Sequence, residues 1–521
     1  MKKAILFFPI FFLPVLSFCA KKTNSATEAL TLSKAQMVYR SLDPKSILQQ
    51  FAYYELYPET EEGKKALRTA WQLIFGQEVS SFESFTIPSI DVASLINLIT
   101  KQSDDTSLEM SLEQLSILEK ASERLKNRSL KGHKILETEE ALKLESDEID
   151  LARTLFIYQF QNDTDKEFKI RSYEASIDLM ALQILAKIKN ESSPEEIVEQ
   201  INQFIFREMR FRFPPHSLYA KDIDVYTFLP SVIDSRQGVC LGVSTLYLCI
   251  AQRIGLDLSI VTPPGHIYVC YDKEGKHINI ETTARGIHLP DETYLGINTK
   301  SLHKRKMKEV VGMAFFNQAS VMNARQEYEK ALELYQRAYE YIPDDPLVKM
   351  LLGMHYLFTG DKKHGTYFLK QVQGKVFDGA VSVETLPDDY LKGYVDIEGL
   401  KMVFMPVDET RESIISKQKE IKALLKKYPK FRAGIMQLAI SYLQLGRSLD
   451  AYQILLQYHR IDPSNPIVEY YLSIICLQRL NYPEAWAFYR SAEKIVHGTG
   501  HFPKALKSLK SSLQKACPCP S

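Results

Sequence analysis

The stretch RQGVCLGVSTLYLCIAQRIG, residues 236–255, decides the fold of the central part of the chain. Its apolar residues recur at spacings of four, three, four and four, which is the spacing of one face of an α-helix. These residues are Val239, Val243, Leu246, Ile250 and Ile254. Gly255 follows as a natural helix C-cap, because glycine tolerates the left-handed backbone that ends many helices. We therefore predict a helix that begins near Cys240.

Cys240 stands at the expected N-terminus of this helix, between Gly238 and Gly242. The free backbone N–H groups and the positive end of the helix dipole favour a thiolate over a thiol there. The glycines allow a substrate to approach the backbone, and the N–H of Cys240 is a candidate oxyanion donor. Gln237 is an auxiliary candidate that lines the cleft or stabilises an oxyanion, with packing at the helix start as the alternative. For Cys240 the alternative is a structural role, because cysteine is commonly buried in protein cores.

Three predicted strands follow the helix, over residues 256–262, 266–271 and 277–282. Turn sequences separate them, so the strands should form an antiparallel meander. A helix followed by such a meander is typical of an α+β domain. His266 begins the second strand directly after the rigid turn Pro263-Pro264-Gly265, which fixes the direction of the strand end. A nucleophilic thiol needs an imidazole to share its proton, and His266 is the candidate.

The register of the following hairpin decides which acid can orient His266. A two-residue turn at Glu274-Gly275 would place Glu281 opposite Tyr268, on the same face of the sheet as His266. A three-residue turn would move Glu281 to the opposite face. Glu281 is therefore the predicted orienting acid, and Asn279, on the same face, is the reserve.

The order of cysteine, histidine and acid resembles the transglutaminase-like superfamily, and most closely its second bacterial core family. The resemblance rests on QFIFREMRFRF at 203–213, FLPSVIDSRQGVCLGVSTLYLCIAQRIGLDL at 228–258, PPGHIYVCY at 263–271 and INIETTARGIHL at 278–289. It implies a papain-like α+β fold and a thiol-based acyl-transfer site, with Cys240 as nucleophile, His266 as base and Glu281 as third member. The superfamily usually has aspartate in the third position. Many close relatives lack the cysteine, so the fold also occurs without catalysis.

Beyond residue 310 the chain contains an internal repeat with a period of 34 residues. Small residues recur at positions 8, 20 and 27, where the two helices of a hairpin pack closely. Among them are Ala319, Ala331, Ala338, Ala439, Ala451, Ala485 and Ala492. The pattern resembles tetratricopeptide repeats over 312–373 and 432–499, with Gly365 at one alanine position. Residues 374–430 form an irregular or degenerate repeat insertion in which EIKALLKKYP is a candidate second helix.

The N-terminal segment MKKAILFFPIFFLPVLSFCA, residues 1–20, has two lysines, an apolar run and small residues. This is the layout of a secretory signal peptide, so we expect an exported protein in the periplasm or cell envelope. LSFC also resembles a lipoprotein box, and membrane attachment through lipidation of Cys19 is the alternative. The expected order of the mature chain is a helical region at 28–150, a transglutaminase-like domain at 151–300, the α-helical repeat solenoid, and a tail at 500–521.

The composition is that of a globular protein, with 45% hydrophobic and 25% charged residues among 521. A net charge of +1 gives no reason to expect a nucleic-acid partner. The basic run HKRKMK at 303–308 is interpreted as a solvated linker. The sequence has no HExxH, P-loop or Gly-rich dinucleotide motif, so we expect neither a metal nor a cofactor.

The sequence therefore predicts an exported cysteine-dependent acyl-transfer enzyme with a repeat-built arm for protein docking. A peptide or amide is the expected substrate, and a protein or peptide segment is the expected partner in the repeat groove. Amide hydrolysis by a cysteine protease or amidase is favoured over transglutamination, because nothing in the sequence indicates a site for an amine. The alternative is a non-catalytic scaffold that uses the same fold and repeats for interaction alone.

Overall fold

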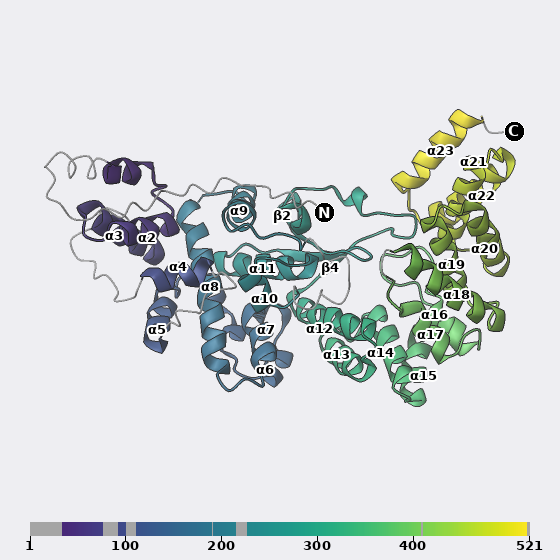
Figure 1. Ribbon diagram of the computed structural model, residues 1–521, viewed down its shortest axis with the longest axis horizontal. Helices are drawn as coiled ribbons and strands as arrows, with labels where there is room; N and C mark the ends of the chain where they lie inside the picture. The colour runs from purple at the N-terminus through teal and green to yellow at the C-terminus, as the bar shows by residue number, and fades with distance from the viewer. Residues whose placement is uncertain are drawn as a thin grey trace, which may run out of the picture.

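The computed structural model describes residues 34–76, 92–100, 111–189, 191–214, 227–407 and 410–517. Figure 1 shows N-terminal helices at one end, a small sheet in the centre, and helical hairpins that stack and curve away at the other end. The expected signal peptide and Cys19 lie outside the described residues. None of the helices within the described ranges is long and apolar enough to cross a membrane.

The N-terminal helices pack around the long helix α8 and share one core with the centre of the molecule. They are α2 (Ile47–Leu56), α3 (Glu61–Phe75), α4 (Val92–Thr100), α5 (Leu112–Ala121), α6 (Thr138–Lys143), α7 (Leu151–Phe160) and α8 (Lys166–Lys187). A single cluster of buried apolar residues runs from Ile47 to Val348. The N-terminal helices are therefore packed as part of the central body.

The central body has the expected α+β architecture, with helix α11 beside a four-stranded antiparallel sheet of order β3-β2-β1-β4. Its helices are α9 (Pro194–Asn202), which continues as a π-helical turn over Gln203–Glu208, α10 (Leu229–Ser235) and α11 (Cys240–Ile254). Its strands are β1 (Ser259–Thr262), β2 (Tyr268–Lys273), β3 (Lys276–Ile280) and β4 (His303–Arg305). The helix predicted to begin near Cys240 is confirmed, and Gly255 caps it with a φ of 90°.

The predicted two-residue hairpin turn is also confirmed, because Lys273 pairs with Lys276 and Val269 with Ile280. Glu274 and Gly275 have φ values of 57° and 75°, as a type I′ turn requires.

One expectation was wrong at the far edge of the sheet. His303–Arg305, interpreted as part of a solvated linker, forms the edge strand β4 and pairs with β1. The strand is only three residues long and all three carry basic side chains, so the alternation of apolar and polar residues that marks a strand is absent. Charged residues are common on edge strands, because they discourage pairing with other chains.

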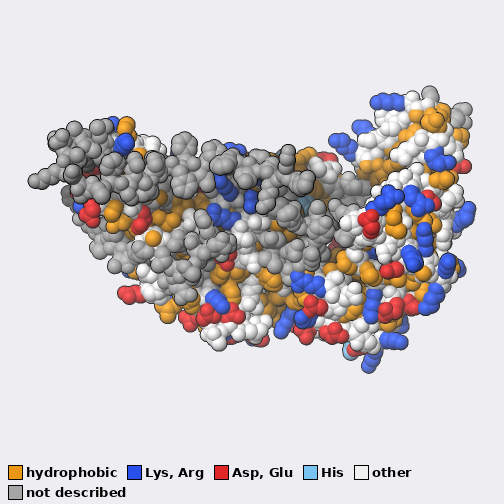
Figure 2. Space-filling view, viewed as in Figure 1, with side chains coloured by type: hydrophobic (Ala, Val, Ile, Leu, Met, Phe, Trp, Pro, Cys, Tyr) orange, Lys and Arg blue, Asp and Glu red, His pale blue; other side chains and the backbone are white. Residues whose placement is uncertain are grey.

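The repeat region forms stacked helical hairpins, as the 34-residue period predicts. The hairpins are α12 (Met307–Ala324) with α13 (Tyr328–Tyr341), α14 (Pro346–Phe358) with α15 (Lys362–Val372), α19 (Arg432–Gln444) with α20 (Ser448–Ile461), and α21 (Pro466–Gln478) with α22 (Tyr482–His497). The small residues Ala331, Ala338, Ala451 and Ala485 are completely buried, which confirms the repeat phase. Acidic and basic side chains are interspersed over the visible face of the repeats (Figure 2).

Gly365 differs from the alanine of the repeat pattern for a steric reason. A Cβ atom at this position would lie 2.5 Å from Leu357 Cδ2 and 2.8 Å from the carbonyl oxygen of Gly353. The second hairpin is therefore packed more closely than an alanine allows.

The irregular stretch between the two pairs of hairpins is helical. It contains α16 (Leu386–Leu391), α17 (Ile397–Phe404) and α18 (Arg411–Lys427). Ile421 of α18 shares a buried cluster with Ile435 and Leu438 of the next hairpin, as the second helix of a repeat would. The stretch therefore continues the stack.

The expected tail contains a further helix, α23 (Lys504–Ala516). Leu506, Leu509 and Leu513, at spacings of three and four, are buried against the last hairpin. An exposed apolar end of the stack is covered in this way, as repeat proteins require at their termini.

Candidate active site

Cys240 is the first residue of α11, and the extended residue Val239 precedes it without a side-chain cap. The backbone N–H groups of the first turn therefore keep their hydrogen-bonding capacity beside the thiol. Gly238 allows this start to pack closely, since a Cβ there would lie 2.7 Å from Val243 Cγ2. Cys240 is a free, partly exposed cysteine, whereas Cys249 and Cys270 are buried.

His266 lies at the end of the turn that precedes β2, where its N–H donates to the carbonyl of Pro263 over 3.1 Å. Its Nε2 is 2.7 Å from Oε2 of Glu281. A hydrogen bond with the Cys240 side chain and the one with Glu281 raise the pKa of His266 to about 9. The imidazole is thus protonated at neutral pH, and its second nitrogen is left for the thiol.

Glu281 immediately follows β3 and is buried, with 4% of its surface exposed. Burial alone would raise the pKa of its carboxyl group, but hydrogen bonds from His266, Thr283 and Tyr294 outweigh burial and lower it to about 2. The backbone N–H of Thr283 donates to Oε1 over 3.1 Å, and the Tyr294 hydroxyl donates to Oε2 over 2.6 Å. Glu281 is therefore a fixed carboxylate at every pH near neutral.

The structure brings Cys240, His266 and Glu281 together and leaves the two auxiliary candidates out of this group. The Asn279 amide donates to the carbonyl of Leu289 over 2.7 Å and to Asp291 over 2.6 Å, so it holds the chain that follows β3. Gln237 pairs through its backbone with Arg212. Within the described ranges, the Gln237 side chain makes no hydrogen bond to any of the three.

Tyr294 is the residue of the site that the sequence did not indicate. Its ring stacks on the His266 imidazole with centroids 5.9 Å apart and an interplanar angle of 15°. The Tyr294 ring also stacks on Tyr268, with centroids 4.4 Å apart and an interplanar angle of 17°. Tyr294 lies in a loop without periodic sequence pattern, so only the fold reveals its place beside the histidine.

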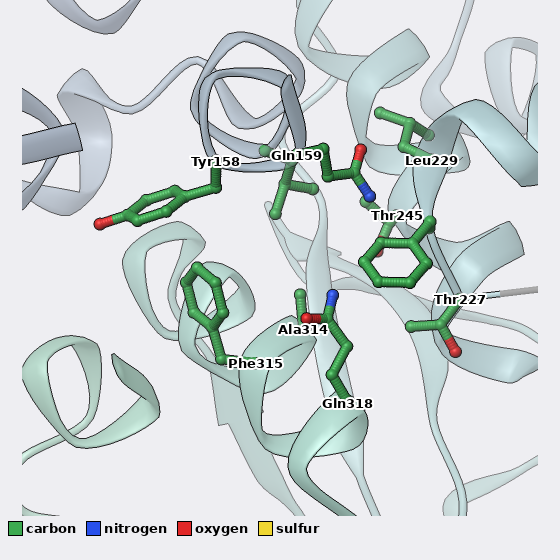
Figure 3. A pocket seen from close by; sticks show the side chains of 10 residues that line it. Tyr158, Gln159, Thr227, Leu229, Thr245, Ala314, Phe315 and Gln318 are labelled. Carbon is green, nitrogen blue, oxygen red and sulfur yellow. The ribbon is translucent and has the colours of Figure 1, made fainter. Parts of the chain in front are cut away.

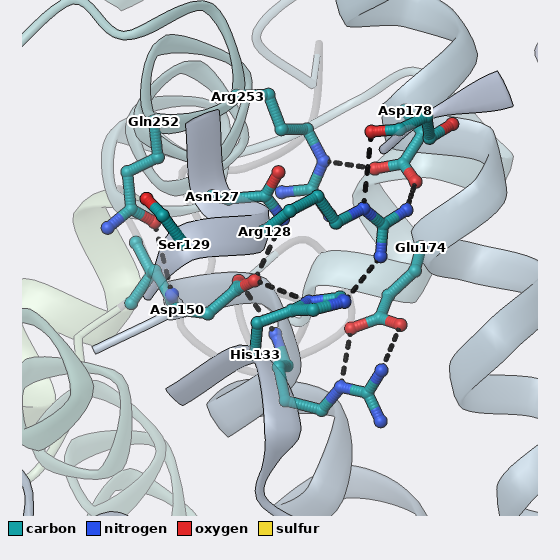
Figure 4. Close-up of polar contacts among 12 residues, drawn as sticks. Asn127, Arg128, Ser129, His133, Asp150, Glu174, Asp178, Gln252 and Arg253 are labelled. Atoms are coloured by element: carbon teal, nitrogen blue, oxygen red, sulfur yellow. Dashed lines mark hydrogen bonds and ion pairs between the residues drawn. The ribbon is translucent and has the colours of Figure 1, made fainter. Parts of the chain in front are cut away.

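A second cluster of titratable groups lies behind α11, where His133, Asp150 and Glu174 have oxygen or nitrogen atoms within 4.8 Å of one another (Figure 4). Arg153 binds Glu174 through two nitrogens at 2.7 and 2.6 Å. Arg253, on α11, binds Asp178 at 2.6 Å. The ion pair between Arg253 and Asp178 of α8 thus anchors α11 to the N-terminal helices.

A cavity of about 160 Å³ lies where α7, the start of α10, α11 and α12 meet (Figure 3). Tyr158, Phe315 and Thr245 are among the residues that line it. Neither Cys240 nor His266 belongs to the lining, so this cavity is separate from the candidate active site.

Residues 171–312 match the family model described as the transglutaminase-like superfamily, so the chain carries a transglutaminase-like domain. Cys240, His266 and Glu281 all lie within the matched residues. None of the curated proteins matches the chain.

Similar solved structures include tetratricopeptide proteins. TTC0263 from Thermus thermophilus is 20% identical, with 39% of this chain and 98% of its own covered and a TM-score of 0.19. The TPR2AB domain of yeast Sti1, in complex with pHSP90, is 16% identical, with 39% and 85% covered and a TM-score of 0.19. Such TM-scores are low, so the description of the repeats rests on the helical hairpins themselves.

Proposed function

We propose that the transglutaminase-like domain is a cysteine-dependent acyl-transfer enzyme that acts on a peptide or amide. The observation that carries the proposal is the chain of contacts from the Cys240 thiol through the His266 imidazole to the Glu281 carboxylate. The partial exposure of the Cys240 side chain at a helix N-terminus supports it.

The proposed chemistry starts from a thiolate–imidazolium pair, which a helix N-terminus and a neighbouring imidazole favour. A thiolate at Cys240 beside an imidazolium at His266 attacks the carbonyl carbon of the amide, and the carbonyl electrons move to its oxygen. The N–H groups at the start of α11 are candidate donors to that oxyanion. When the intermediate collapses, the C–N bond breaks and the nitrogen takes a proton from His266, so the amine leaves and a thioester remains. Glu281 keeps the imidazole oriented and stabilises its protonated form.

The second half of the reaction decides between hydrolysis and transamidation. Water gives up a proton to His266 and attacks the thioester, which releases a carboxylic acid and restores the thiolate–imidazolium pair. A second amine in place of water would give a new amide. Hydrolysis needs no further binding site, whereas an amine must be bound in competition with water, and we therefore favour a peptidase or amidase.

The repeat stack supplies a docking arm in this proposal. Stacked hairpins with close-packed alanines form an extended surface that suits a protein or peptide segment. We further propose that the protein is exported to the periplasm or cell envelope. That location would bring the site to envelope peptides, and lipidation of Cys19 would keep it at the membrane.

The proposal is tested with a thiol-reactive amide or glutamine probe on the full mature chain. Wild-type protein should be labelled at Cys240, and Cys240→Ala should remove the label. Cys249→Ala is the matched control, because Cys249 lies on the same helix but is completely buried, and it should leave labelling unchanged. Labelling that persists in Cys240→Ala would refute the assignment of the nucleophile.

The second candidate is a non-catalytic interaction protein, and the continuous stack from α12 to α23 favours it. In that case Cys240 would be a structural residue. The probe would then label no cysteine of the protein faster than it labels the cysteine of an unfolded control peptide. Binding of a partner by the repeats would then be the only activity of the chain.

A further inference from the structure

Tyr294 makes two contacts with the candidate catalytic group at once. Its hydroxyl donates to Oε2 of Glu281 over 2.6 Å, the same oxygen that lies 2.7 Å from Nε2 of His266. Its ring is nearly parallel to the His266 ring. Tyr294 therefore restrains the carboxylate by a hydrogen bond and the imidazole by stacking.

The segment after Tyr294, residues 295–301, leaves the central body and reaches the C-terminal repeats; we call it the tether (Figure 1). The carbonyl of Gly296 accepts a hydrogen bond from Nε2 of His501 over 2.8 Å, at the turn between α22 and α23. Ile297 is 8% exposed and belongs to the apolar cluster of these last helices. The tether is thus fixed to the end of the repeat stack.

The tether is fixed a second time, to the linker between α15 and α16. The Asn298 side-chain oxygen accepts hydrogen bonds from the N–H groups of Val381 at 3.2 Å and Ser382 at 2.8 Å. The N–H of Lys300 donates to the carbonyl of Gly379 over 2.7 Å. Two separate parts of the repeat stack therefore hold the few residues that follow Tyr294.

We propose that Tyr294 is a positioning residue for Cys240, His266 and Glu281, and that the repeat stack holds it in place through the tether. The proposal rests on the acyl-transfer function proposed above and adds a route by which the docking arm acts on the site. A partner that changes the curvature of the repeats would move the anchors of the tether relative to the sheet. Because one residue separates Tyr294 from Gly296, such a movement reaches the Glu281 hydrogen bond directly.

The effect of losing the hydrogen bond from Tyr294 to Glu281 depends on the groups that face His266. They are the Cys240 thiol from α11, the Glu281 carboxylate after β3 and the Tyr294 hydroxyl; Tyr268 of β2 backs Tyr294 and donates to Asp291. The tyrosine hydroxyl and the imidazole compete for one carboxylate oxygen. Without the hydroxyl, Glu281 becomes a stronger base, since the Tyr294 hydrogen bond is among the causes that lower its pKa. The imidazolium should then be bound more tightly, while the freer carboxylate orients it less well.

The test uses the full mature chain and two readouts, the pKa of His266 by NMR titration and the rate of Cys240 alkylation by iodoacetamide at pH 7. Tyr294→Phe keeps the stacked ring and removes the hydroxyl. Asn298→Ala removes one anchor of the tether at a distance from the site, and His501→Ala removes the other. Ser301→Ala, an exposed side chain of the same tether, is the matched control.

Tyr294→Phe should raise the pKa of His266 by a few tenths of a unit or more and slow alkylation severalfold. Asn298→Ala and His501→Ala should each move both readouts in the same direction as Tyr294→Phe does. Asn298→Ala should add no further change in the Tyr294→Phe background, because the effects of coupled residues are not additive. Ser301→Ala should match wild type. Folded variants that lower the melting temperature but leave both readouts unchanged would overturn the proposal. A wild-type Cys240 with no more than ordinary thiol reactivity would instead refute the acyl-transfer function.

Discussion

Glu281→Gln should lower the pKa of His266 without removing its shift altogether. The substitution keeps the shape of the side chain and removes the charge that faces Nε2 at 2.7 Å. An opposite charge at this distance raises the pKa of a histidine by about one to three units. The hydrogen bond with Cys240 is the largest single cause of the pKa of about 9, against an ordinary value of 6.5, and the hydrogen bond with Glu281 is the next. We therefore expect a fall of about one unit in Glu281→Gln and a separate fall in Cys240→Ala.

The assay is an NMR titration of the histidine ring resonances, with His266→Ala to assign the signal. Glu274→Gln is the matched control, because it makes the same chemical change in the exposed turn of the same hairpin and should leave the titration of His266 unchanged. If Asn279→Ala lowered the pKa of His266 more than Glu281→Gln, the amide would be the orienting group. An unaltered pKa in both Glu281→Gln and Cys240→Ala would refute the contacts on which the site is built.

The remaining predictions concern stability, and urea denaturation measures each. Glu281→Gln should lower the free energy of unfolding most between about pH 4.5 and 6.5. The Glu281 carboxylate contributes fully to stability above its ordinary pKa, and the His266 imidazolium contributes fully below its ordinary pKa. That loss of stability should fade as the pH falls toward 2 or rises through 9, and a pH-independent loss would contradict the ion pair. Ala451→Leu should overpack its hairpin and cost about 1–3 kcal/mol, whereas exposed Leu449→Ala should be nearly neutral. Arg253→Met should cost about 3–5 kcal/mol, because it removes a completely buried cation that pairs with Asp178. Lys131→Ala, in an exposed ion pair with Glu148, should be nearly neutral.

Much of the candidate site could be predicted because local rules fix it. Apolar spacing places the helix, and the glycine that ends it is recognisable in the sequence. The two-residue turn at Glu274-Gly275 sets the hairpin register, and the register alone puts Glu281 on the face of His266. Cys240, His266 and Glu281 are thus brought together by the start of one helix and the register of one hairpin.

The features that the sequence did not reveal depend on contacts between distant segments. Tyr294 reaches His266 through a loop whose course is set by its anchors on the repeats. The edge strand His303–Arg305 has no apolar alternation, and its pairing with β1 comes from tertiary structure. The buried ion-pair network joins Asp178 to Arg253 across 75 residues of sequence, a separation that no local pattern records.

The most direct test of the central claim is the rate of Cys240 alkylation by iodoacetamide at pH 7, compared between wild type and His266→Ala. Peptide mapping by mass spectrometry reports Cys240 separately from the buried cysteines. The alkylation rate should be roughly tenfold lower in His266→Ala, because the alanine variant has no imidazolium to stabilise a Cys240 thiolate. Equal rates in the two folded proteins would contradict it, and the domain would then be a scaffold for the repeats.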